Sequence, residues 1–435
     1  MNLQRPPVDA DKVVAAASAR AGNYRWVICA LLFAATAINY VDRQILGVLK
    51  PTLQHELGWN ELEYADIVFW FQAAYAVGYL GFGWIIDRIG ARLGFAAAII
   101  IWTIAHIAHA AVRSVTGFTW VRIGLGLGES GNFPAGVKAV AEWFPKSERA
   151  LATSIFNAGT GIGAIITPLI VPVIVSLSGW RMAFVITGSL SLVWLVVWLF
   201  MYTRPRENMN VNAAELAFIE SDPPDPEGHT TIPWTRLLRV KETWAFAIGK
   251  FLIDPIWWMY LFWLPGFFAD RYHLDLTTFG PPVVAVYIMS DIGSVAGGWL
   301  SSQLIKRGVS INGARKITML ISALAVTPIA FAMYADNLWL AVAIIGVATA
   351  AHQSFSANLY TLPSDVFPRA AVASVIGIGG TVGAIGGMLM SKYTGYILDA
   401  LHSYTPIFVV GASAYLLALL VVQLLSPRYA PARID

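Results

Sequence analysis

The chain of 435 residues contains little charge and only one cysteine. Asp, Glu, Lys and Arg make up 13% of it, against roughly 25% in soluble domains. Hydrophobic residues make up 57%. This balance excludes an ordinary soluble domain and indicates a protein with many membrane-spanning segments. The single cysteine, Cys29, excludes a disulfide framework and a thiol-based metal site.

The first 24 residues lack the apolar core and cleavage site of a secretory signal peptide. We therefore expect residues 1–24 to form a soluble cytoplasmic tail.

Twelve apolar runs are long enough to cross a membrane, because a hydrocarbon core of about 30 Å needs about 20 helical residues. They lie at residues 25–47, 64–86, 93–112, 117–142, 149–176, 181–203, 243–269, 281–304, 316–335, 338–362, 371–397 and 404–425.

The predicted fold is therefore an all-α membrane protein with twelve transmembrane helices in two six-helix bundles. We place the bundles at residues 25–203 and 243–426. The polar segment 204–242 between them is expected to be a cytoplasmic loop with a short helix at 212–220, and residues 427–435 a cytoplasmic tail.

Lys and Arg residues set the expected orientation, since they concentrate in cytoplasmic loops. With both termini in the cytoplasm, 20 of the 29 lie on the cytoplasmic side, 5 on the far side and 4 within spans. This bias supports the span count and the cytoplasmic termini.

The two halves contain similar segments in the same order. Residues 154–165 align with 374–385, and residues 144–146 with 367–369. Gly83 and Trp84 in the second span match Gly298 and Trp299 in the eighth. A six-plus-six repeat with a site between the halves is the arrangement of major facilitator transporters, so we expect that pseudo-symmetric fold.

Four charged residues lie within or at the end of apolar runs: Asp42, Arg43, Arg122 and Glu129. A charge near the bilayer centre costs at least about 2.5–3.5 kcal/mol on insertion scales, so such residues normally face a cavity or pair with one another. Two acids beside two arginines predict an anion site next to proton carriers.

Arg122 and Glu129 are seven residues apart, so they share one helix face and can form a pair. A Glu that alternates between an arginine and an apolar environment can carry a proton. A structural ion pair that only fixes helix packing is the alternative. Asp42 and Arg43 are adjacent and must face different partners, one the helix 4 charges and the other the cavity. Alternatively, both lie at the membrane surface near Lys50.

The segment Gly83–Arg92 resembles the major facilitator loop signature between helices 2 and 3. Asp87 is expected to pair with neighbouring helix ends at a cytoplasmic gate, while Arg88 and Arg92 hold the loop on that side. The second half has Ser302 in place of Asp87, so the gate is expected to be asymmetric.

Aromatic and amide side chains within spans suit the ring faces and hydroxyl groups of a sugar, although aromatic belts at the membrane interface are the alternative explanation. The predicted substrate contacts of this kind are Tyr75, Trp257, Trp258, His352, Gln353 and Asn358.

The motifs Asn39–Arg43 in helix 1 and Arg122 with Glu129 in helix 4 resemble the anion:cation symporter family of the major facilitator superfamily. Residues 250–258, 351–360 and 372–380 are similar to segments of bacterial hexuronate transporters, which import galacturonate and glucuronate with protons.

The resemblance implies that Asp42 and Glu129 couple protons, and that Arg43 and Arg122 serve the substrate carboxylate or hold those acids. It also places Tyr40 and Tyr75 at the cavity, with Asn157 as a polar contact. Some vesicular relatives carry an arginine in helix 7, which this chain lacks around Ile253.

The sequence therefore predicts a proton-coupled hexuronate symporter of the bacterial inner membrane, and not an enzyme. Its expected partners are a sugar-acid anion, protons and lipid. We expect a monomer, with no nucleic acid, cofactor or metal. Another sugar acid such as galactonate remains an alternative. The most distant alternative is an intramembrane serine protease, with Ser130 in Gly128–Gly131 as nucleophile and His352 as base.

Overall fold

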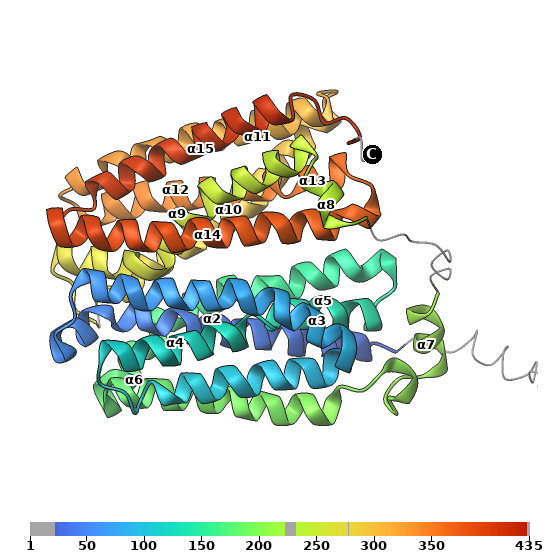
Figure 1. Cartoon of the computed structure of the whole chain (residues 1–435), viewed down its shortest axis with the longest axis horizontal. Coiled ribbons are helices and arrows are strands. Elements are labelled where there is room, and N and C mark those ends of the chain that lie inside the picture. The colour runs from blue at the N-terminus through green and yellow to red at the C-terminus, as the bar shows by residue number, and fades with distance from the viewer. Residues whose placement is uncertain (1–21, 222–231, 277, 433–435) are drawn as a thin grey trace, which may run out of the picture.

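The structure, a computed structural model, describes residues 22–221, 232–276 and 278–432. Over these residues the chain forms helices and no strands. Figure 1 shows two bundles side by side, the first blue to green and the second yellow to red, with their helices along the long axis. The predicted all-α fold is confirmed in this part of the chain.

The first bundle contains five continuous helical elements: α2 (Tyr24–Leu57), α3 (Glu61–Ala108), α4 (Val115–Glu129), α5 (Asn132–Trp143) and α6 (Lys146–Met201). α3 and α6 each make two crossings, because Gly90 and Gly179 leave the helical conformation with φ of 84° and 78°. α4 and α5 together make the fourth crossing and are separated at Ser130–Gly131. The bundle therefore has six crossings.

The second bundle also has six crossings: α9 (Lys241–Tyr272), α10 (Gly280–Lys306), α11 (Ile311–Val326) extended by η2 (Thr327–Tyr334), α12 (Leu338–Leu359) extended by α13 (Thr361–Val366), α14 (Arg369–Leu401) and α15 (Thr405–Leu425).

Each of the twelve predicted spans coincides with one crossing. By length and hydropathy alone, nine stretches of the described chain qualify as membrane spans. One of the nine, Ala152–Met201, holds the two crossings that meet at Gly179. The fourth crossing does not qualify because it is divided into α4 and α5, each of which is too short to span a membrane.

The segment between the bundles contains η1 (Pro205–Glu207), α7 (Ala213–Ile219) and α8 (Trp234–Leu237). α7 confirms the short helix predicted at 212–220. The predicted tail up to residue 21, residues 222–231 of the loop and the last three residues lie outside the described residues.

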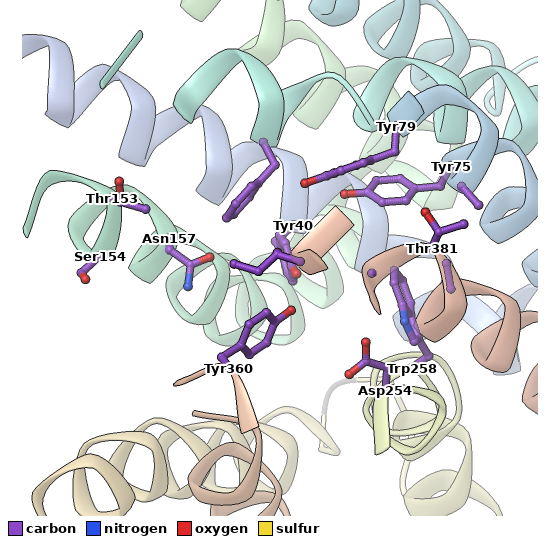
Figure 2. A pocket seen from close by; sticks show the side chains of 15 residues that line it. Tyr40, Tyr75, Tyr79, Thr153, Ser154, Asn157, Asp254, Trp258, Tyr360 and Thr381 are labelled. Carbon is purple, nitrogen blue, oxygen red and sulfur yellow. The ribbon is translucent and has the colours of Figure 1, made fainter. Parts of the chain in front are cut away.

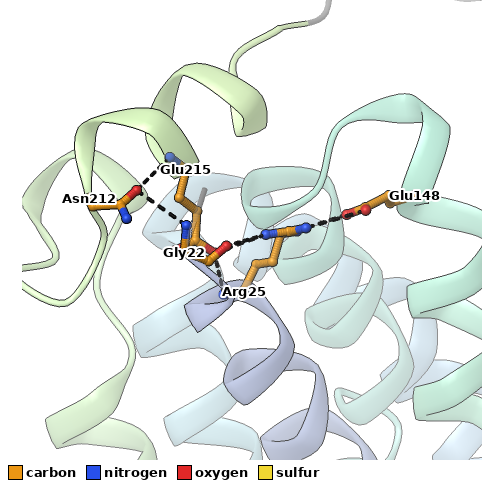
Figure 3. Close-up of polar contacts among 5 residues, drawn as sticks. All are labelled: Gly22, Arg25, Glu148, Asn212 and Glu215. Atoms are coloured by element: carbon orange, nitrogen blue, oxygen red, sulfur yellow. Dashed lines mark hydrogen bonds and ion pairs between the residues drawn. The ribbon is translucent and has the colours of Figure 1, made fainter. Parts of the chain in front are cut away.

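α7 is anchored through Arg25 to the end of the first bundle at which α2 begins (Figure 3). The Arg25 guanidinium donates to Glu148 at the start of α6, at 2.8 Å, and to Glu215 of α7, at 3.2 Å. The backbone N–H of Arg25 also donates to Glu215, whose side chain is fully buried. One arginine therefore ties α2, α6 and α7 together.

The turns of the two bundles repeat. Left-handed backbone in the described chain occurs at six residues, which form pairs between equivalent turns: Gly58 with His273, Gly90 with Gly308, and Gly179 with His402. Each ends a helix or joins two helices, where a positive φ reverses the chain within one residue. The repeat inferred from sequence is therefore present in the backbone as well.

The bundles contact each other along α3 with α14, α6 with α10, and α2 with α9. At the end of α2 these contacts are tight. A β-carbon on Gly47 would lie 3.0 Å from the carbonyl oxygen of Leu261. Tyr64 Oη donates to the carbonyl of Phe262 at 2.8 Å, and Gln44 Nε2 donates to Tyr287 Oη at 2.9 Å. The halves are therefore closed at this end.

Candidate functional site

A cavity of about 510 Å³ lies between the bundles and is referred to below as the central cavity (Figure 2). The first bundle contributes Tyr40, Tyr75, Ala76, Tyr79, Phe133, Thr153, Ser154 and Asn157, and the second Asp254, Trp258, Tyr360, Ile376, Gly380, Thr381 and Ala384. Its residues from α6 and α14 lie within about the first four turns of those helices. The cavity is thus displaced toward the end opposite the closed one.

Arg43 lies behind an aromatic wall of the central cavity. Its guanidinium carbon is 4.7 Å from the ring centroid of Tyr40, 4.8 Å from that of Tyr75 and 5.4 Å from that of Trp258. All three rings line the cavity, while Arg43 itself is only 2% exposed. Cation–π attraction holds the guanidinium in place, and movement of these rings would open it to the cavity.

Glu129 is the ion-pair partner of Arg43. Arg43 Nε lies 2.8 Å from Glu129 Oε2, and its Nη2 donates to Asn39 Oδ1, one helical turn earlier. Glu129 is fully buried. The pairing of Glu129 with Arg122 expected from their shared helix face is wrong as a direct contact, because seven residues span about 10 Å along the axis.

Arg122 is held by the backbone of helix 1 instead. Its Nη2 donates to the carbonyl oxygen of Arg43 at 3.1 Å, and its guanidinium carbon lies 5.1 Å from the Phe71 ring centroid. The side chain is fully buried, and Nε and Nη1 have no hydrogen-bond partner among the described residues. Arg122 therefore carries spare donors close to the Arg43–Glu129 pair.

Asp42 faces away from the central cavity into the first bundle. Its Oδ1 lies 3.2 Å from His106 Nε2 in the second crossing of α3, and its Oδ2 accepts from Ser191 Oγ at 3.1 Å in the second crossing of α6. His106 also contacts Thr187 Oγ1 at 2.8 Å. The expectation of different partners for Asp42 and Arg43 is confirmed. Both side chains are buried within the protein.

The second bundle places a different charged group beside the central cavity. Lys250 Nζ lies 2.7 Å from Asp254 Oδ1, one turn later in α9, and donates to Tyr360 Oη, also at 2.7 Å. Asp254 and Tyr360 line the cavity, but Lys250 is buried behind them. Trp258 follows Asp254 by one more turn on the same helix face.

The predicted substrate contacts divide into two groups. Tyr40, Tyr75, Asn157 and Trp258 line the central cavity, and Figure 2 shows their side chains directed at a common space. Arg43 lies directly behind three of these four, while Arg122 lies further from the cavity. The assignment of these residues to substrate binding remains a prediction.

The predicted contacts in helices 7 and 10 mostly lie elsewhere. Trp257 stacks on His352 at 5.3 Å, and His352 Nδ1 contacts Tyr415 Oη at 2.7 Å inside the second bundle. Asn358 Nδ2 donates to the carbonyl of Ser354 at 2.9 Å. These three side chains, together with the half-buried Gln353, are not among those that line the cavity.

Several functional candidates were missed from the sequence. Tyr79, Thr153, Ser154 and Thr381 are small or aromatic residues in Gly-rich helices, and nothing in the sequence gives their rotation. His106 had a usable signal, because His106 and His109 interrupt an otherwise apolar run at helical spacing.

The predicted gate is described only in part. The side chain of Asp87 falls outside those that the structure describes. Arg88 is exposed, and Arg92 donates to the carbonyl of Leu199, near the end of α6. In the second bundle Arg315 pairs with Asp365 at 3.4 Å and donates to Ser301 Oγ at 3.0 Å. The role of Asp87, Arg88 and Arg92 in gating remains a prediction.

The protease alternative has no matching geometry. Ser130 Oγ donates to the carbonyl of Leu127 at 2.6 Å, and the chain bends there between α4 and α5. His352 is in the other bundle, engaged by Tyr415. A nucleophilic serine needs its base within hydrogen-bond reach.

Known proteins resemble the chain over nearly its full length. The hexuronate transporter of Escherichia coli (strain K12) is 31% identical over 404 residues, which cover 92% of this chain and 93% of that protein. The galacturonate transporter of Dickeya chrysanthemi is 29% identical over 69% of this chain and 88% of that protein. Other relatives are named as transporters of D-galactonate and, as probable assignments, L-galactonate and galactarate or D-glucarate.

Among solved structures, a bacterial homolog of the human lysosomal transporter Spinster, in an inward-facing and unoccupied conformation, matches with a TM-score of 0.72. It is 15% identical, and the match covers 94% of this chain and 97% of that one. At this identity the likeness shows the fold alone. The family model described as Major Facilitator Superfamily matches residues 32–391, and the chain belongs to that family.

Proposed function

We propose that the protein is a proton-coupled symporter that imports hexuronates, such as galacturonate and glucuronate, by alternating access. The observation that carries the proposal is the buried Arg43–Glu129 pair behind the aromatic wall of the central cavity. A buried guanidinium needs a negative partner. A substrate carboxylate and the Glu129 carboxylate therefore compete for Arg43.

The proposed orientation follows from the charged loops. The central cavity is displaced toward the end where α6 and α14 begin, at Lys146 and Arg369, and this end carries most of the Lys and Arg residues. We take it as the cytoplasmic side of a bacterial inner membrane, with both termini on that side. The described structure then corresponds to an inward-open state with the outer end closed.

The transport cycle couples the two ligands through this exchange of partners. Facing outward, Glu129 takes up a proton and releases Arg43, which binds the uronate carboxylate. Facing inward, Glu129 loses the proton and pairs again with Arg43, so the carboxylate is displaced toward the cytoplasm. Arg122, with its spare donors, stabilises whichever carboxylate is nearest. Protons and substrate then bias one conformational equilibrium, as coupled transport requires.

Asp42 is the second proton site in this proposal. Its contacts with His106 and Ser191 lie within the first bundle and away from the substrate. It therefore acts on the conformational equilibrium and not on the affinity for the sugar.

Uptake of labelled galacturonate into proteoliposomes with an imposed pH gradient tests the proposal. The wild-type protein is expected to accumulate galacturonate against its gradient. Glu129→Gln should lose accumulation but retain exchange of internal for external substrate. Full gradient-driven accumulation by Glu129→Gln would overturn the proton role, and an unchanged affinity in Arg122→Ala would remove Arg122 from the site.

An aldonate such as galactonate is the second candidate, because relatives named as galactonate transporters match this chain at 25–29% identity. Uronate and aldonate present the same carboxylate to Arg43, so the arginines do not separate them. Thermal unfolding in the presence of each sugar acid would rank them, and a larger stabilisation by galactonate would favour the second candidate.

A further inference from the structure

Asp254 is a charged residue with no role in the exchange described above, yet it lies on the wall of the central cavity. Of the described residues that line this cavity, it is the only one with a formal charge. A carboxylate inside a membrane protein is costly and marks a functional site by default. An acid on the wall of an anion site is unexpected, because it repels the cargo.

Lys250 neutralises the charge of Asp254 but does not itself line the cavity, so it is not exposed to the substrate. It neutralises Asp254 at 2.7 Å, donates to Tyr360 Oη at 2.7 Å and lies 4.1 Å from the Tyr360 ring centroid. Two of the three N–H donors of the Lys250 ammonium are thus used, and the Tyr360 ring packs against the ammonium group. Its side chain is 5% exposed, against 18% for Asp254. Asp254, and not Lys250, is therefore the member of this pair that is exposed to the cavity.

One oxygen of Asp254 remains available. Oδ1 is bound by Lys250, whereas Oδ2 is directed toward Gly383 of α14, where a β-carbon would lie only 2.4 Å away. A glycine at this position leaves space for the carboxylate. An ionised carboxylate accepts up to about four hydrogen bonds. No hydrogen bond to Asp254 Oδ2 occurs among the described residues, and Asp254 is part of the cavity wall, so donors in the cavity can use the remaining capacity.

We propose that Asp254, held by Lys250, accepts hydrogen bonds from the hydroxyl groups of the sugar and makes the second bundle selective for polyhydroxylated monoanions. This inference rests on the proposed function and names the substrate class of the same site. The carboxylate end of the cargo faces Arg43, and its hydroxyl end faces Asp254. Trp258 lies between the two, one turn from Asp254 and 5.4 Å from Arg43, and covers one face of the sugar.

The arrangement also selects against dianions. A sugar acid with a carboxylate at both ends would bring its second charge to Asp254, and Lys250 lies buried behind the cavity wall, where it does not reach that charge. Galacturonate and galactonate, with hydroxyls at that end, are expected to bind at least tenfold more tightly than galactarate.

The test compares two ligands that differ only in hydroxyl groups. Galacturonate and tetrahydropyran-2-carboxylate share a ring and a carboxylate, but the second has no hydroxyls. Binding of each to the purified full-length protein is measured by calorimetry. In Asp254→Asn, galacturonate should bind about tenfold or more weakly, as expected for hydrogen bonds to a charged acceptor. Tetrahydropyran-2-carboxylate should change by less than twofold.

Two further variants make the result independent of folding. Lys250→Met/Asp254→Leu removes both charges and should show the same loss for galacturonate alone, because a buried pair can be replaced by apolar residues. Asp336→Asn is the matched control, since it makes the same change at an exposed ion pair with Arg271, and it should bind both ligands as the wild type does.

Equal weakening of both ligands in the Asp254 variants would assign the pair a structural role and overturn the inference. So would equal affinity of the wild type for galactarate and galacturonate. A wild type that binds no sugar acid would instead overturn the proposed function, so the two failures are distinguishable.

Discussion

The two bundles repeat one architecture but hold their charges in different surroundings. In the first bundle Asp42, Arg43, Arg122 and Glu129 are all at most 2% exposed, and aromatic rings separate Arg43 from the central cavity. In the second bundle Asp254 is part of the cavity wall, with Lys250 behind it. Sealed charges can exchange partners only when the protein moves, whereas a charge on the wall is available to a ligand at once. The difference suggests a division between coupling in the first bundle and recognition in the second.

The largest effect is expected when a buried charge of the first bundle is removed. Arg43→Ala should weaken galacturonate binding by about 100-fold or more, because it removes the cation that receives the carboxylate. Removing one partner of a buried pair also destabilises a protein by about 3–5 kcal/mol. Thermal unfolding should therefore show that Arg43→Ala/Glu129→Ala is more stable than Arg43→Ala, although neither transports. A double variant no more stable than the single one would show that the pair is not energetically coupled.

An intermediate effect is expected for His106→Phe, which should reduce proton coupling and leave substrate binding unchanged. His106→Phe removes a contact of Asp42 without touching the central cavity. Accumulation driven by a pH gradient should fall about fivefold or more, because the variant removes the contact with Asp42 and the hydrogen bond with Thr187, a loss of about 1 kcal/mol. The affinity for galacturonate should stay within twofold. Uptake and calorimetry on the same preparation check this, and a parallel loss of affinity would place Asp42 in the substrate site.

The smallest expected effect concerns the closed end, where the bundles meet. Tyr64→Phe removes the hydrogen bond to Phe262 across the interface. Loss of about 1 kcal/mol should shift the equilibrium toward outward opening about fivefold. The readout is the labelling rate of Thr394→Cys, a buried position near this end, in a Cys29→Ser background. Tyr396→Cys, which is 64% exposed, is the control and should label at the same rate with or without Tyr64→Phe.

Hydropathy and loop charge predicted the twelve crossings because each helix must satisfy its own backbone in lipid. The rotation of each helix was not predictable in the same way. Helices 7 and 10 are apolar on most faces, so their polar residues can face either the cavity or the bundle. His352 and Asn358 face the bundle, against expectation, while Asp254 faces the cavity.

The ion-pair partner of Glu129 could not be predicted from the sequence either. The seven-residue spacing to Arg122 is a property of one helix, but the contact with Arg43 depends on how α2 lies against α4. Local periodicity therefore identified the charged residues correctly and their pairing incorrectly.

The turn at Gly90 has a mechanical consequence. Because the chain reverses there within one residue, the two crossings of α3 form a hairpin with arms of similar length. Tyr75 lies 15 residues before the turn and His106 lies 16 residues after it, which puts both at about 22–24 Å from the hinge. Tyr75 on one arm lines the central cavity, and His106 on the other arm contacts Asp42, the proposed second proton site. If the hairpin tilts as one body, Tyr75 and His106 move by similar amounts, which would couple the proposed substrate and proton sites.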